Sequence, residues 1–485
     1  LNKYEKFISE WILKGHKKDW KTNVYGQVKS WIDNGLKERA VTRDLDWGIP
    51  VPIKGLKEKV LYVWFDAPIG YISSTKEWAE NNGKDWKPYW KSDKTKIIHF
   101  IGKDNIVFHC IIFPVILKES SGYILPHNVP ANEFLNLEGQ KISTSKNWAV
   151  WLHEYLKEFP GREDLLRYVL TSNAPETKDN DFTWKEFQAR NNNELVSIYG
   201  NFVNRVFVLI NKYFKGEVPS PNNLNNKDYE ILKSIKKFPE KIGKKIEEFK
   251  FREASQNLIN LSRIGNKYLA EQEPWKLVKT EIDKVQNIMY IAVQITATLS
   301  VLSEPFLPFS SKKLKSLLNI SKSKLKWNDI INSNEIIKPG HIISKPELLF
   351  KKVEDEEIDY QITKLNERSE ENLNKKKRTS YNNFSKLNIS VGSIINVDQI
   401  KSFKNYKKFK IDTGSKNINI ISEVSINFNE KKCIGQKVSI ITNLKPIKIK
   451  GEISEGLILS TKNEKGEIIF IIPDNNKIKN GLSIS

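Results

Sequence analysis

The apolar residues at the start of the chain follow a helical pattern that changes near residue 40. Over residues 1–40 they recur at the spacing of an amphipathic helix. From about 41 to 150, short apolar runs alternate with helix-like stretches. The runs are 60–64, 97–101 and 111–117. This alternation predicts α/β units around a parallel sheet.

The middle of the chain, residues 151–345, has apolar residues at helical spacing in several long segments. The segments are 164–172, 184–214, 229–249, 252–272 and 281–302. Successive amphipathic segments of this length predict a helix bundle.

The pattern changes again after residue 345. Residues 346–380 are polar, with acidic residues at 354–357 and basic residues at 375–378, a composition typical of a linker. From 381 to 485, short β runs alternate with turns rich in Gly, Asn, Asp and Pro, which predicts a small barrel of about five strands. The β runs are 393–397, 407–412, 417–421, 437–442, 457–460 and 468–472.

Composition narrows the class of protein. The formal charge of +21 predicts an anionic partner such as nucleic acid. The heavy use of Lys, Ile and Asn is what an AT-rich genome produces, so genome composition accounts for part of the positive charge. No apolar run looks long enough to span a bilayer, and no signal peptide opens the chain, so we expect a soluble cytoplasmic protein without a membrane. Cys110 and Cys433 are far apart, which excludes a disulfide scaffold and a cysteine metal site in this chain.

One ten-residue segment, 139–148, combines a glycine with basic and hydroxyl side chains. Gly139 allows a tight turn, and the residues that follow offer charge and hydrogen bonds to a polyphosphate. They are Lys141, Ile142, Ser143, Thr144, Ser145 and Lys146. A solvated serine-rich turn is the alternative, and the ten residues alone favour that alternative.

Two further segments predict a pocket. Trp64 and Tyr71 flank Ala67 and Pro68 just after an expected strand, where open α/β sheets bind ligands. In the second segment, Gly102 ends a strand, and one helical turn brings Asp104 and His109 towards one pocket. Filled core and a packed histidine are the alternatives. No Ser/His/Asp or metal-ligand spacing accompanies them.

Four motifs in this order resemble the methionyl-tRNA synthetase family. They are RDLDWGIP at 43–50, VWFDAPIGY at 63–71, FIGKDN at 100–105, and KISTS at 141–145, which is similar to the KMSKS signature of class I synthetases. The similarity continues through 164–168, 175–176 and 181–184 and covers essentially the whole chain. The resemblance implies a partial Rossmann-like domain over 1–150, an anticodon-binding helix bundle over 151–345 and an OB-fold over 381–485.

The family reaction activates methionine with ATP and Mg²⁺ to methionyl-adenylate and transfers the methionyl group to tRNA(Met). By motif match, the 139–148 loop closes over the ATP phosphates, and Arg43 and Asp104 support ATP or the tRNA acceptor end. The residues implied in the methionine pocket are Trp64, Ala67, Pro68, Tyr71, Asn105 and His109.

The resemblance also implies two tRNA contacts. Asn201, Arg205 and Trp275 match the residues that read the CAU anticodon, although a solvated pair and a core tryptophan are the alternative. Residues 443–459 are similar to an OB-fold tRNA-binding module that often pairs two subunits, which implies a homodimer. The module departs from the family at Glu423. Its expected tRNA-binding side chains are Lys445, Lys448 and Lys450.

The chain departs from the family pattern in two ways. Thr144 stands where the signature has its second lysine, and Lys146 follows two positions later. The HIGH-type signature, the acidic residue for the methionine ammonium and the structural zinc site are expected before Leu1. Together with the single methionine, Met289, this predicts a fragment that is inactive alone. The alternatives are a non-catalytic tRNA-binding protein, half of a split enzyme, and an enzyme for another amino acid.

Overall fold

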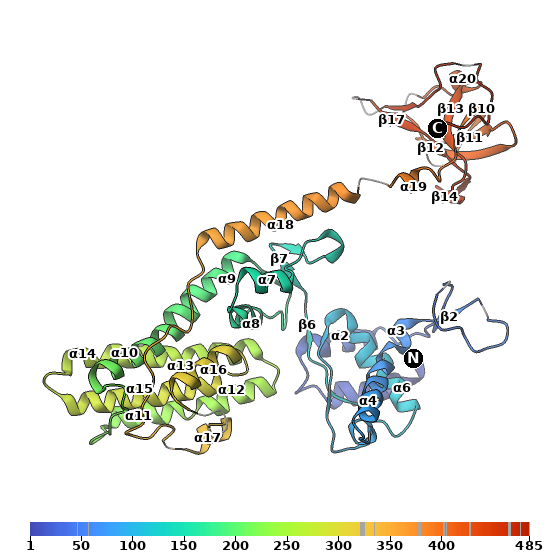
Figure 1. Cartoon of the computed structure of the whole chain (residues 1–485). Helices are drawn as coiled ribbons and strands as arrows, with labels where there is room; N and C mark the ends of the chain where they lie inside the picture. Colours follow the sequence, from blue (N-terminus) through green and yellow to red (C-terminus); the bar gives the residue numbers. More distant parts are fainter. Residues whose placement is uncertain are drawn as a thin grey trace. The chain divides into compact units, whose positions relative to one another are not determined.

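The computed structural model comprises two compact units, Leu1–Glu370 and Glu371–Ser485 (Figure 1). The structure describes most of the chain. Within helices, the side chains of Trp64 and of residues 369–376 are outside this description. The residues outside the description are 46, 57, 321–324, 334, 377–379, 401, 402, 404, 426–427, 464–466, 476 and 485.

The amino-terminal part is an α/β arrangement with parallel strand pairs, which confirms the predicted fold class. Strand β3 (Ile97–Ile98) pairs in parallel with β5 (Pro126–Asn128), and β4 (Ile101–Gly102) pairs in parallel with β6 (Ala131–Asn132). The label η marks 3₁₀ and π-helical turns. The other elements up to residue 105 are η1 (Asn2–Tyr4), α1 (Glu5–Ile8), η2 (Ser9–Lys14), α2 (Thr22–Asp33), β1 (Thr42–Arg43), β2 (Val60–Leu61), α3 (Val63–Asp66), η3 (Ala67–Ile69), α4 (Gly70–Asn81), α5 (Lys87–Lys91) and η4 (Lys103–Asn105).

The apolar run at 111–117 is helical, which differs from the strand expected there. It forms the π-helical turn η5 (Phe108–Ile112) and α6 (Phe113–Glu119). Phe113 and Leu117 are buried, as are Cys110 and Ile111. A short run that is buried on all sides has no period, so the sequence could not distinguish a strand from a helix.

The 139–148 segment begins in a three-stranded sheet, whose strand order is β8-β7-β9. Strand β7 (Leu135–Leu137) pairs antiparallel with β8 (Gln140–Lys141) and parallel with β9 (Asn180–Phe182). The two residues between β7 and β8, Glu138 and Gly139, have φ values of 48° and 74°. Two positive φ values in a two-residue hairpin match a type I′ turn, and the glycine makes that turn accessible.

The helix bundle confirms the predicted fold class for the middle of the chain, in which β9 is a short strand. Its helices are α7 (Leu152–Glu158), α8 (Glu163–Ser172), α9 (Trp184–Arg190), η7 (Asn191–Gly200), α10 (Asn201–Phe214), α11 (Asn226–Ile235), α12 (Phe238–Glu247), α13 (Phe251–Gln272), α14 (Pro274–Leu277), α15 (Ile282–Leu302), α16 (Pro308–Leu317) and α17 (Trp327–Asn332). Contrary to the expectation of no such run, α15 is long and apolar enough to cross a membrane, but 94% of its apolar window is buried inside the protein.

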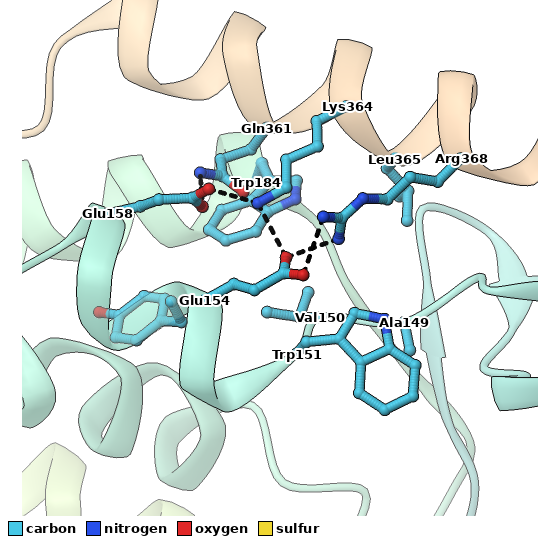
Figure 2. Close-up of a pocket in the computed structure, with 11 residues that line it drawn as sticks. Ala149, Val150, Trp151, Glu154, Glu158, Trp184, Gln361, Lys364, Leu365 and Arg368 are labelled. Carbon is cyan, nitrogen blue, oxygen red and sulfur yellow. Dashed lines mark hydrogen bonds and ion pairs between the residues drawn. The ribbon is translucent and has the colours of Figure 1, made fainter.

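The structure differs from the linker expected over 346–380. Helix α18 (Asp355–Lys376) occupies most of it, and its first turns lie on α7 (Figure 2). Arg368 donates to both carboxylate oxygens of Glu154, at 2.8 Å for Nη2, and Lys364 pairs with Glu154 at 2.9 Å and with Glu158. Charged residues of this stretch therefore pair across two helices rather than forming a solvated linker, and the side chains of the basic residues at 375–378 lie outside the described part of the chain.

We expect the Glu154→Gln variant to be about 1–2 kcal/mol less stable at pH 7, because it leaves Arg368 and Lys364 without their shared carboxylate. The hydrogen bond from Arg368 lowers the pKa of Glu154 to about 2. The stabilisation is therefore complete above the unfolded pKa of roughly 4.3 and is lost as the pH falls towards 2. Urea unfolding from pH 7 to 3.5 measures this, and an equal stability gap at all pH values would contradict it. Lys157→Gln on the exposed side of α7 is the control.

The second unit is built on a five-stranded antiparallel sheet with two further strand pairs, β14-β15 and β17-β18, which confirms the predicted all-β fold class. Its order is β12-β11-β10-β13-β16, with a core that includes Ile394, Phe409, Ile420 and Ile440. Glu423, where the module departs from the family, ends β12 and pairs with Tyr406, so the departure does not interrupt the strand pairing. The elements are α19 (Tyr381–Phe384), β10 (Ile389–Gln399), β11 (Tyr406–Asp412), β12 (Asn417–Glu423), α20 (Glu430–Cys433), β13 (Lys437–Ile441), β14 (Ile447–Ile449), β15 (Glu452–Ser454), β16 (Leu457–Ile458), β17 (Ser460–Lys462) and β18 (Ile468–Phe470).

Candidate functional site

A cavity of about 560 Å³ lies where the two pocket segments meet. The start of α4 and the turn before it form one wall, and β4 with the helical turns after it forms the other. Five of the expected pocket residues line it, namely Ala67, Pro68, Tyr71, Asn105 and His109. The side chain of Trp64 lies outside the described part of the chain. Sequence reasoning missed Phe100 and Phe108, which also line the cavity.

A hydrogen bond joins Tyr71 and His109 across this cavity. The Tyr71 hydroxyl lies 3.0 Å from Nε2 of His109, and Nδ1 of His109 lies 3.0 Å from the Asn105 carbonyl oxygen. A carbonyl can only accept, so Nδ1 carries the proton and Nε2 accepts from the Tyr71 hydroxyl. Burial lowers the pKa of His109, so its ring is neutral at pH 7.

A second histidine, His99, stands behind the first. Its ring centroid is 5.2 Å from that of His109 and 5.3 Å from that of Tyr71. Burial, together with His109, lowers the pKa of His99 to about 4. Both imidazoles are therefore uncharged at neutral pH, and this end of the cavity has no net charge. Sequence reasoning passed over His99 because it stands alone in an apolar run.

The 139–148 loop is anchored at both ends and exposed in the middle. Ser143 and Trp148 exchange two backbone hydrogen bonds of 2.9 Å, and the Trp148 indole donates to the Leu137 carbonyl at 2.8 Å. Between them, η6 (Thr144–Lys146) carries its side chains into solvent. Lys141 and Lys146 are exposed, and neither forms an ion pair with a described residue. The loop thus presents two uncompensated cations on a fixed base.

The ring of Phe134 lies between the base of the loop and the FIGKDN segment and has a lysine from each of them near it. Lys141 Nζ is 5.7 Å from the centroid of Phe134, and Lys103 Nζ is 4.3 Å from the same centroid. Lys103 also pairs with Asp179 at 2.6 Å and with Glu133 at 2.9 Å. The sequence offered Lys103 only as part of the motif, with no role.

The two remaining residues expected at the reaction site lie outside the cavity. Asp104 is exposed, and its carboxylate packs against Gly102, where an added Cβ would lie 2.9 Å from its oxygen. The Arg43 guanidinium lies 3.8 Å from the centroid of Tyr62 and donates to the Thr42 carbonyl at 2.8 Å. Their roles stay predictions.

The anticodon residues expected from the sequence are held near one another at one end of the bundle. The Arg205 guanidinium lies 5.0 Å from the Trp275 ring centroid, and 37% of Trp275 is exposed. Asn201, one helical turn before Arg205 on α10, donates to Asn266 of α13 at 3.3 Å. An exposed ring with a cation on it offers a stacking face for an unpaired base.

In the second unit, the three expected lysines lie at and beside the β14–β15 hairpin. Lys445 precedes β14, Lys448 lies within it, and all three side chains are exposed. Lys450, in the turn, has a φ of 51°, and its Nζ is 4.9 Å from the centroid of Phe403 and 5.3 Å from that of Tyr406. The hairpin therefore presents positive charge beside two aromatic rings.

Comparisons with known proteins agree along the whole chain. Three family models match: "tRNA synthetases class I (M)" over 1–207, "Anticodon binding domain of methionyl tRNA ligase" over 218–369, and a tRNA binding domain over 389–482. The methionine–tRNA ligase of Christiangramia forsetii is 56% identical over 496 residues, covering 100% of this chain and 72% of the relative. That of Bacteroides fragilis is 51% identical over 491 residues, covering 100% and 71%.

Solved structures show the same fold. The free form of Mycobacterium tuberculosis methionyl-tRNA synthetase matches with a TM-score of 0.61 at 23% identity, over 73% of this chain and 68% of that chain. The same protein in complex with methionyl-adenylate gives 0.62 at 24% identity, over 72% and 67%. At these identities the likeness concerns the fold alone.

Proposed function

The chain belongs to the methionine–tRNA ligase family of class I aminoacyl-tRNA synthetases, and we propose how its residues share the family reaction. Methionine is activated with ATP to methionyl-adenylate, and the methionyl group passes to tRNA for initiation and elongation of protein synthesis. In the first step the methionine carboxylate attacks the α-phosphate, and pyrophosphate leaves. In the second, the terminal ribose hydroxyl of the tRNA takes the methionyl group.

We propose that the cavity around Tyr71 and His109 binds the methionine side chain. The observation that carries this role is the hydrogen bond from the Tyr71 hydroxyl to a neutral His109 inside an aromatic-walled cavity. A thioether is uncharged and polarizable and gains from contact with aromatic rings. A charged side chain would lose its hydration there without gaining a partner ion. Trp64, Ala67, Pro68 and Asn105 belong to the same proposal.

The Tyr71→Phe variant tests the pocket. It removes one hydroxyl and leaves the His109 Nε2 acceptor unpaired, so we expect the KM for methionine to rise about 5- to 20-fold with kcat changed less. Methionine-dependent ATP–pyrophosphate exchange by the intact enzyme, in which this and all other kinetic variants are made, measures both constants. Tyr89→Phe is the matched control, because Tyr89 is equally exposed (45%) and its hydroxyl forms no hydrogen bond with a described residue. An unchanged KM in Tyr71→Phe would exclude the pocket.

We propose that the 139–148 loop closes over the ATP phosphates. Lys141 and Lys146 supply positive charge, and the hydroxyls of Ser143, Thr144 and Ser145 offer hydrogen bonds, while Mg²⁺ enters with the nucleotide. The uncompensated charge of the two lysines supports this role, because an ion-paired lysine would first have to release its partner. Arg43 and Asp104 are proposed to support ATP or the acceptor end from the side.

We propose that tRNA contacts both units. Asn201, Arg205 and Trp275 read the anticodon, and Lys445, Lys448 and Lys450 bind phosphates with little sequence preference. The exposed aliphatic residues Ile447 and Ile453 on the same hairpin support pairing of two subunits through this module. We place the enzyme in the cytoplasm, where its tRNA is charged.

A further inference from the structure

A loop between α8 and β9, residues 173–179, contacts three other segments of the chain. Its residue Glu176 is 7% exposed, and the Glu176 carboxylate accepts a hydrogen bond from the backbone amide of Arg252 at 3.1 Å, in the first turn of α13. Its Asp179 pairs with Lys103 at 2.6 Å and accepts the Phe134 amide at 2.9 Å. Helix α13, the FIGKDN segment and the start of β7 therefore meet at one short loop.

The strand that follows the loop holds the turn before the phosphate-binding lysine. Asp181, in β9, accepts the Gly139 amide with both carboxylate oxygens, at 3.0 and 2.9 Å. On the other side of that turn, the Glu138 carboxylate accepts the Trp184 amide at 2.7 Å. The turn from which β8 and Lys141 start is thus fixed by the strand that leaves the loop.

The first residue of α13 also touches the wall of the methionine pocket. The ring of Phe251 lies 6.3 Å from that of Phe100, and the ring of Phe249, just before the helix, lies 5.4 Å from it. Phe100 lines the cavity. One end of α13 is therefore in contact with both the loop and the pocket.

The other end of α13 leads into the anticodon residues. The helix has 22 residues and is about 33 Å long. It ends at Gln272, and its capping residue Glu273 directly precedes Pro274 and Trp275. Gly265 lies so close to α10 that an added Cβ would stand 2.5 Å from the Phe202 ring, next to Asn201. A close contact of this kind leaves α10 little room to shift against α13.

We propose that α13 transmits the binding of the anticodon to the 139–148 loop, with Glu176 and Asp181 as positioning residues. Glu176 ties the first turn of α13 to the loop, and Asp181 ties the following strand to the turn at Gly139. The inference rests on the proposed roles of Trp275 and of the 139–148 loop. It adds that the two sites affect each other through Glu176.

Hydrogen exchange of the 139–148 segment, with and without an RNA hairpin bearing a CAU loop, tests the coupling in the whole protein. In the unaltered protein we expect the hairpin to change exchange in this segment about threefold or more. In Glu176→Ala, the hairpin should bind within about twofold of the unaltered affinity while the change at 139–148 is lost. Glu176→Gln retains an oxygen that accepts a hydrogen bond from the Arg252 amide, so this variant should regain the change in exchange at 139–148.

Thr177→Ala, at an exposed neighbour in the same loop, is the control and should respond like the unaltered protein. In charging assays, Glu176→Ala should lower kcat for tRNA about tenfold while the KM for tRNA and the tRNA-independent ATP–pyrophosphate exchange stay within about twofold. A full response at 139–148 in Glu176→Ala overturns the proposal, as does a loss in Glu176→Gln as complete as in the alanine variant. A hairpin that binds without preference for CAU would instead contradict the anticodon role.

Discussion

Replacing Lys141 with alanine is expected to slow methionyl-adenylate formation about 100- to 1,000-fold, the effect of removing one preorganised group from a charged transition state. Lys141 is exposed, forms no ion pair with a described residue and stands at the end of a hairpin fixed by Asp181. Its charge is therefore available when negative charge develops on the leaving pyrophosphate. ATP–pyrophosphate exchange should show the loss mainly in kcat, with the KM for methionine changed little.

Two companion variants make this result interpretable. Lys146→Ala tests whether Lys146 replaces the lysine that Thr144 displaces from the signature, and we expect a loss of about tenfold. Near-normal adenylation by Lys146→Ala would remove that hypothesis. Lys157→Ala, on the exposed face of α7 outside the loop, should leave exchange unchanged. If Lys141→Ala and Lys157→Ala had the same activity, the loop would not serve the phosphates.

Replacing Trp275 with alanine is expected to lower kcat/KM for tRNA about 5- to 150-fold, because stacking of a base on an aromatic ring contributes about 1–3 kcal/mol. Trp275 is 37% exposed with Arg205 over its ring, so the ring has a face left for a base. Adenylation should be unchanged, since it needs no tRNA. Aminoacylation and ATP–pyrophosphate exchange on the same preparation separate the two steps.

The pairing of Arg205 with Trp275 has a further consequence for the same experiment. Because the guanidinium and the ring touch, Arg205→Gln and Trp275→Ala should not be additive, and the double variant should lose less than the product of the single losses. The exposed tryptophan Trp78, on α4, is 40% exposed and provides the control in Trp78→Ala. An equal loss in Trp78→Ala would point to a general fall in stability rather than to the anticodon.

The sequence predicted helices and strands correctly where a regular spacing of apolar residues continued over a whole segment. The helices 252–272 and 281–302 and the strands 407–412 and 417–421 each end within a residue or two of the observed elements. The failures are physical. The run at 111–117 is buried on every side and carries no period, and α18 looked like a linker because its charges are balanced by α7, which precedes it by about 200 residues.

The candidate site was predictable from the motifs and only in part from residue chemistry. A hydroxyl-rich loop with two lysines and a glycine suggested phosphate binding, but Tyr71, His109 and Trp275 gained their roles from resemblance. The contacts of Phe100, Lys103 and Glu176 could not be foreseen, because each joins segments that are far apart in the sequence. Such pairings follow from the fold alone.

The central claim is that this enzyme joins methionine to the tRNA that carries CAU. The most direct test is methionine acceptance by two transcripts that differ only in the anticodon cytosine. We predict that replacing this base lowers kcat/KM about 5- to 150-fold, the loss from one base-specific set of contacts worth roughly 1–3 kcal/mol. Equal charging of the two transcripts would contradict the account.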